Sequence, residues 1–182
     1  MEKNVFLEER KELELSDYMH FQSGDRGNLG GQVPVMIYRL LEYSIREQLV
    51  EQYSKEEQIQ IFRKAGYRAG VYFAEHFLDL SLPFSEFIAH LQACFQELKV
   101  GILRIEKFDR ETGKMILTIS EDVDCSGLPM LGETVCNYDE GILSGILTSY
   151  TKKDYNAIEI DCWATGDRVC RFQAETKETA GE

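Results

Sequence analysis

The sequence predicts an α+β domain in which N-terminal helices pack on an antiparallel sheet. Apolar residues recur at helical spacing over roughly residues 35–95. Beyond residue 100 the pattern changes to short, alternating apolar runs separated by turns. Helices followed by strand pairs, with one further helix between the pairs, are typical of this class. At 182 residues the chain is long enough for a single domain with a sizeable core.

Three helices are expected in the first half. One follows Pro34, which suits the first turn of a helix. The next begins at Ser54, because SKEE has the spacing of a capping box, and it continues to about Leu80. A third starts near SLPFSEF and has a strongly aromatic face. The first helix carries one apolar stripe: Ile37, Leu41, Ile45 and Leu49.

Strands are expected in the second half. VGILRIEKFDRETGKMILTISED holds two alternating runs around DRETGK and predicts a hairpin. A helix is expected over roughly 138–150, followed by the strands NAIEIDCWA and RVCRFQAE with a TGD turn between them. Residues 1–17 are interpreted as a charged extension, 18–175 as the domain and 176–182 as a disordered tail. FQSGDRGNLGGQVP predicts a glycine-rich loop or hairpin.

Composition limits the possible partners and location. The net charge of −12 argues against binding to nucleic acid or to an anionic membrane, since both require a positive surface. The N-terminus has no apolar stretch of the signal-peptide kind, and no eighteen apolar residues run together. We therefore expect a cytoplasmic protein without membrane insertion.

Five cysteines in a reducing compartment do not indicate a disulfide framework. Cys136, Cys162 and Cys170 fall within one short segment and leave three interpretations open: buried small side chains, a redox pair, or a metal site. With a carboxylate they would supply the four ligands of a structural zinc ion. Glu159 lies three residues before Cys162, so a bulge or the end of the strand is needed to bring both to one ion. The two other cysteines are expected to be packing residues: Cys94 and Cys125.

The segments CNYDEGILSGIL and IEIDCWATGDRVCRF resemble the 4-vinyl reductase-like domain family. This family is related to subunits of the transport-protein particle (TRAPP) and to aromatic-sensing domains of sigma-54-dependent regulators. In those sensors a Cys, Glu, Cys, Cys set binds zinc, so the resemblance implies zinc as cofactor. GYRAGVYFAE also resembles the glycine-containing helix of the sensors, and the likeness spans about residues 20–175. The implied zinc ligands are Cys136, Glu159, Cys162 and Cys170.

The related sensors enclose small aromatic ligands between these helices and the sheet. The resemblance therefore implies an apolar pocket, although a packed core accounts for the same side chains. Glycine pairs four apart in two predicted helices, at Gly66 and Gly70 and at Gly141 and Gly145, indicate a close approach of a backbone or ligand, or packing on the sheet. The expected lining residues are Tyr67, Val71, Phe73, Phe77, Phe84, Phe87, Leu91 and Phe95.

No catalytic motif supports the reductase activity in the family's name, since GxGxxG after a strand, a P-loop and HExxH are all lacking. Glu121 and Asp122 are interpreted as solvated carboxylates. We predict a stand-alone sensory or carrier domain that binds a small apolar or aromatic ligand and contains structural zinc. Relatives imply a homodimer, for which helix 35–51 is the candidate face, and output through a protein partner. The alternatives are a TRAPP-like interaction scaffold without a ligand and an accessory protein for tetrapyrrole vinyl reduction.

Overall fold

The structure, a computed structural model, describes residues 13–19 and 31–177. The chain divides into two units, Met1–Gln32 and Val33–Glu182. In the first unit, helix α1 (Leu15–Tyr18) has no buried residue. Most of the predicted charged extension, most of the predicted glycine-rich loop and the end of the predicted tail lie outside the described residues.

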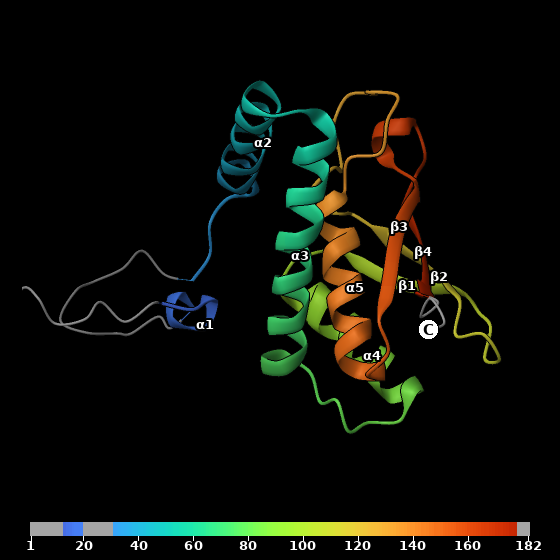
Figure 1. Cartoon of the computed structure of the whole chain (residues 1–182). Coiled ribbons are helices and arrows are strands. Elements are labelled where there is room, and N and C mark those ends of the chain that lie inside the picture. Colours follow the sequence, from blue (N-terminus) through green and yellow to red (C-terminus); the bar gives the residue numbers. More distant parts are fainter. Residues whose placement is uncertain (1–12, 20–30, 178–182) are drawn as a thin grey trace, which may run out of the picture. The chain divides into compact units, whose positions relative to one another are not determined.

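The second unit has the predicted order of helices, strand pair, helix and strand pair (Figure 1). Its helices are α2 (Val35–Gln52), α3 (Lys55–Phe77), α4 (Phe84–Glu97) and α5 (Asn137–Thr151). Its strands are β1 (Ile102–Phe108), β2 (Met115–Ser120), β3 (Tyr155–Asp161) and β4 (Cys170–Thr176), with the 3-10 helix η2 (Trp163–Thr165) before β4. The predicted α+β class is confirmed. Within the described ranges, no helix is both long and apolar enough to cross a bilayer.

The four strands form one antiparallel sheet in the order β1-β2-β4-β3. The two predicted hairpins therefore join through β2 and β4, and Cys170 pairs with Ile119. The β3–β4 register shifts between Glu159 and Asp161, so the end of β3 has the irregularity that a shared site for Glu159 and Cys162 requires. After η2, Gly166 adopts a φ of 104°, a conformation that favours glycine, and the chain reverses toward β4.

Helix α5 packs on β3 and β4, and α4 packs beside β1. Helix α3 runs along α5 (Figure 1). Glycines permit this contact: a Cβ built on Gly66 would lie 2.0 Å from the Tyr138 carbonyl oxygen, and one on Gly141 would lie 2.2 Å from that of Arg63. The predicted glycine faces thus meet each other, backbone to backbone, rather than the sheet.

Helix α2 attaches to the rest of the second unit through polar side chains. Tyr38 Oη donates to Asp124 Oδ1 at 2.6 Å, and Arg39 Nη2 donates to the Ser126 carbonyl at 2.8 Å. The buried residues of α2 are Glu42 and Arg46. The apolar side of the helix is exposed instead, at Met36, Ile37, Leu40, Leu41 and Ile45. This arrangement reverses the usual amphipathic pattern, in which the apolar stripe faces the core.

Candidate functional site

Four cysteines from separate segments meet at the junction of α5 with the last two strands. Cys125 lies in the loop after β2, and Cys136 is the N-cap of α5. Cys162 directly follows β3, and Cys170 is the first residue of β4. All four side chains are buried, and their Sγ atoms lie within 4.8 Å of one another.

The spacing of these sulfurs suits a tetrahedral metal ion. The Sγ–Sγ distances are 3.1 Å for Cys125 and Cys170, 3.6 Å for Cys136 and Cys170, and 3.9 Å for Cys136 and Cys162. Four sulfurs at about 2.3 Å from a zinc ion would be about 3.8 Å apart. The donor set therefore fits zinc, and such a set of thiolates leaves no position for a reacting water.

Without a metal, the thiols interact strongly with one another. Hydrogen bonds from Cys125, Cys136 and Cys170 hold the pKa of Cys162 far below its usual value. Hydrogen bonds to the other three thiols raise the pKa of Cys136 instead. The cluster thus concentrates thiolate character on one sulfur that the other three surround, which is the charge distribution that favours a soft cation.

Glu159 lies beside the four sulfurs. Its Oε2 accepts a hydrogen bond from the Cys136 amide at 2.9 Å, and its own amide donates to Glu140 Oε1 at 2.8 Å. Its Oε1 is buried and has no hydrogen-bond partner among the described residues. Burial, followed by the charge of Cys162, raises the pKa of Glu159 to about 9.

The structure thus brings three of the four expected ligands together, places Glu159 alongside them and adds Cys125. Sequence reasoning assigned Cys125 to packing because the sequence template contained no position for it. The available signal was its proximity: Cys125 shares the loop that leads to Cys136. Cys94, by contrast, is not part of the group, and its thiol contacts the Phe77 carbonyl at 3.6 Å.

Three buried aspartates adjoin the cysteine cluster: Asp122, Asp124 and Asp139. The interpretation of Asp122 as solvated is wrong, since only 1% of it is exposed and its Oδ1 accepts the Asp124 amide at 2.8 Å. Burial and then the charge of Asp124 raise the pKa of Asp122 to about 7. The turn after β2 directs Asp122 inward, a consequence of backbone geometry that the polar local sequence does not reveal.

A salt bridge connects this region to α3. Arg63 on α3 pairs with both carboxylate oxygens of Glu140 on α5, and its Nη2 donates to Oε1 at 2.9 Å. The Glu140 side chain is only 1% exposed. Since Glu140 Oε1 also accepts the Glu159 amide, one carboxylate joins α3, α5 and β3 beside the cysteines.

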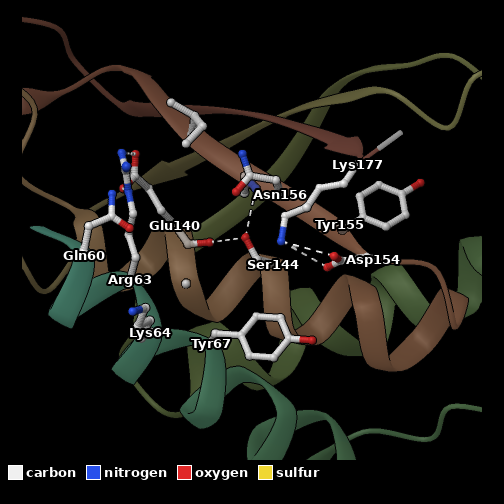
Figure 2. Close-up of a pocket in the computed structure, with 13 residues that line it drawn as sticks. Gln60, Arg63, Lys64, Tyr67, Glu140, Ser144, Asp154, Tyr155, Asn156 and Lys177 are labelled. Carbon is white, nitrogen blue, oxygen red and sulfur yellow. Dashed lines mark hydrogen bonds and ion pairs between the residues drawn. The ribbon is translucent and has the colours of Figure 1, made fainter. Parts of the chain in front are cut away.

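A polar groove of about 610 Å³ lies between α3, α5 and the start of β3 (Figure 2). Ser144 Oγ bridges its base: it donates to the Glu140 carbonyl at 2.6 Å and accepts from the Ala157 amide at 2.9 Å. Lys177 pairs with Asp154 at its rim. Of the eight predicted pocket residues, Tyr67 alone borders this groove.

The other predicted pocket residues lie mainly between α3, α4 and α5, where rings pack on one another. Phe87 stacks on Tyr150 with centroids 3.8 Å apart, and Phe73 lies 5.1 Å from Phe77 and 5.5 Å from Phe95. We call these five rings the aromatic cluster. Phe87, Leu91 and Phe95 are fully buried, Val71, Phe73 and Phe84 partly buried, and Phe77 is 46% exposed. A ligand pocket at these positions stays a prediction.

Residues 115–176, which contain α5 and three of the four strands, match the model of the 4-vinyl reductase domain. The predicted resemblance to this family is confirmed. Two uncharacterized proteins of Methanocaldococcus jannaschii are similar to the chain. One is 30% identical over 83 residues, 46% of this chain and 47% of that protein, and the other is 32% identical over 96 residues, 53% and 56%. The chain spans about half the length of these relatives.

Solved structures share the fold. The phenol-responsive sensory domain of the transcription activator PoxR matches with a TM-score of 0.63 and 15% identity, over 81% of this chain and 76% of that domain. Subunit 3 of the trafficking protein particle complex from Naegleria fowleri matches with a TM-score of 0.65 and 13% identity, over 81% and 98%. At these identities the likeness extends to the fold alone.

Proposed function

We propose that the chain is a small-molecule-binding sensory domain whose C-terminal hairpin is held to α5 by a structural zinc ion. The cysteine cluster is the observation that carries this proposal: buried sulfurs converge at a helix–hairpin junction in a fold shared with a phenol-responsive domain. Cys136, Cys162 and Cys170 supply three zinc ligands. When bound, the ion would crosslink the start of α5 to both strands of the hairpin.

The proposed ligand is a small apolar or aromatic molecule, and the aromatic cluster is its proposed site. Phe73 and Phe77 lie at its rim, and Phe77 is substantially exposed, so their displacement would admit a ring-sized molecule. Tyr150 stacks on Phe87 near the C-terminal end of α5, while Cys136 caps the N-terminal end. Helix α5 therefore connects the proposed ligand site to the metal site.

Thermal unfolding with phenol and toluene tests ligand binding. Both compounds should raise the melting temperature of the zinc-loaded chain, because a ligand that binds only the native state stabilises it. Phe73→Leu, which removes a ring that bridges Phe77 and Phe95, should reduce the shift. Tyr53→Leu, at an exposed position after α2, should leave it unchanged. The absence of a shift in wild-type protein would contradict ligand binding.

The second candidate is an interaction scaffold, and the exposed apolar side of α2 favours it. Contiguous exposed apolar side chains mark surfaces that bind another protein. We propose a second copy of this chain as the occupant, because α2 directs its charged residues inward and keeps its apolar side free. A dimer of this kind is compatible with the sensory role, and a further protein partner would receive the signal.

A further inference from the structure

We infer that Cys125, and not Glu159, is the fourth metal ligand, so that the site is a tetrathiolate. This inference rests on the proposed zinc site and specifies its donor set. It departs from the Cys, Glu, Cys, Cys set that the family resemblance implies. The four cysteine sulfurs form a single group of mutually close atoms, and the Glu159 carboxylate is not part of that group.

The position of Cys125 supports a ligand role. Its Sγ is 3.1 Å from that of Cys170, and its side chain has no exposed surface. A buried cysteine that serves only as packing needs apolar neighbours, whereas Cys125 lies against three other thiols. The turn that carries it is anchored to α2, since Tyr43 Oη donates to the neighbouring Asp124 carbonyl at 3.1 Å. The loop is thus held where its sulfur completes a tetrahedron.

Glu159 has a different role in this arrangement. Its Oε2 already accepts the Cys136 amide, which fixes the backbone that carries one of the ligands. Its own amide is held by Glu140, whose carboxylate pairs with Arg63. Glu159 is therefore a positioning residue that orients Cys136, in the way that groups around a metal site commonly hold its ligands.

X-ray absorption spectroscopy of the full chain loaded with zinc tests the donor set directly. Four sulfur neighbours at about 2.3 Å are expected. Three sulfurs with one oxygen would overturn the inference while leaving the proposed zinc site intact. If the chain binds no stoichiometric zinc, the proposed site and the inference both fail. This measurement uses wild-type protein and therefore does not depend on the folding of any variant.

Cobalt-substituted variants separate the two roles. Cys125→Ser should lower the sulfur-to-cobalt charge-transfer intensity by about a quarter, because one of four thiolates is lost. Glu159→Gln should keep the wild-type spectrum and weaken cobalt binding, by about 10- to 100-fold as for other residues that hold metal ligands. Cys94→Ser, outside the cluster, is the control and should change neither property. The opposite result, an unchanged spectrum in Cys125→Ser and an altered one in Glu159→Gln, would assign the ligand role to Glu159.

Discussion

At the scale of single residues, buried carboxylates connect segments that lie far apart in sequence. Glu140 is the central example, because it accepts hydrogen bonds from Arg63 on α3 and from the Glu159 amide on β3. The guanidinium of Arg63 is partly exposed while the carboxylate is not. Removing the arginine would therefore leave a charge that water reaches poorly, and a buried charge without its partner is costly.

We predict that Arg63→Met lowers the free energy of unfolding by about 3 kcal/mol. The cost comes from the unpaired Glu140 carboxylate and not from the lost side-chain volume, which Met largely retains. Urea denaturation measures it. Lys55→Met is the matched control, since Lys55 pairs with Glu133 where both side chains are exposed, and such pairs contribute at most about 1 kcal/mol. Equal losses in the two variants would contradict the central role of Glu140.

At the scale of elements, the contact between α3 and α5 organises the domain. A Cβ at Gly70 would lie 2.2 Å from the Ile142 carbonyl oxygen, and one at Gly145 would lie 2.3 Å from the Tyr67 carbonyl oxygen. These atoms belong to backbone, so no side-chain rotation relieves the overlap. The close approach also brings Arg63 within reach of Glu140 and places α5 against the strands that carry the cysteines.

Gly66→Ala should destabilise the domain by about 3 kcal/mol, because the two helices must move apart. Helix propensity alone predicts the opposite sign, since alanine is favoured over glycine by about 1 kcal/mol within a helix. Thermal and urea unfolding decide between the two. Gly31→Ala serves as control, because a Cβ there meets no atom within 4 Å. A stabilised Gly66→Ala protein would show that the helices are not in backbone contact.

At the scale of the whole molecule, one proposed metal ion closes the C-terminal half of the fold and one exposed helix face is left for association. The cysteines join the loop after β2, the start of α5 and both strands of the last hairpin. A single ion bound by all of them would hold these four segments together at one point. Zinc binding should therefore contribute strongly to the stability of the domain.

Removing the metal should lower the melting temperature of the zinc-loaded chain by about 10 °C or more. Calorimetry before and after treatment with a chelator measures the change, and added zinc should restore the original transition. Cys162→Ser should melt at the lower temperature with or without chelator, which controls for effects of the chelator itself. A chelator-treated wild type that is free of metal and melts unchanged would contradict a structural role.

Replacing Leu40 and Leu41 together by Glu should convert a dimer to a monomer. Both side chains are more than 60% exposed, so the change should cost the monomer little stability. Sedimentation equilibrium measures the mass of both proteins. Lys64→Glu, which alters charge on the exposed side of α3, is the control and should remain dimeric. A monomeric wild type would leave the apolar side of α2 to a different protein partner.

Much of the fold is predictable because short-range patterns encode it. The capping box at Ser54 is present as predicted, with Ser54 Oγ accepting the Glu57 amide at 3.1 Å. Both hairpins and the helix between them lie where the alternating and helical patterns place them. The environment of Cys125 and Asp122 was not predictable, because the loop between β2 and α5 has no periodicity to indicate which side chains turn inward.

By itself, the sequence determined the α+β class, the order of the elements and the three cysteines of the C-terminal segment, because periodicity and spacing are local properties of the chain. Only the tertiary structure decided which face of α2 is buried, which helix meets the paired glycines and which sulfur joins the other three. Each of these depends on a contact between segments distant in sequence. Packing selects such contacts through shape and charge, and no local pattern records them.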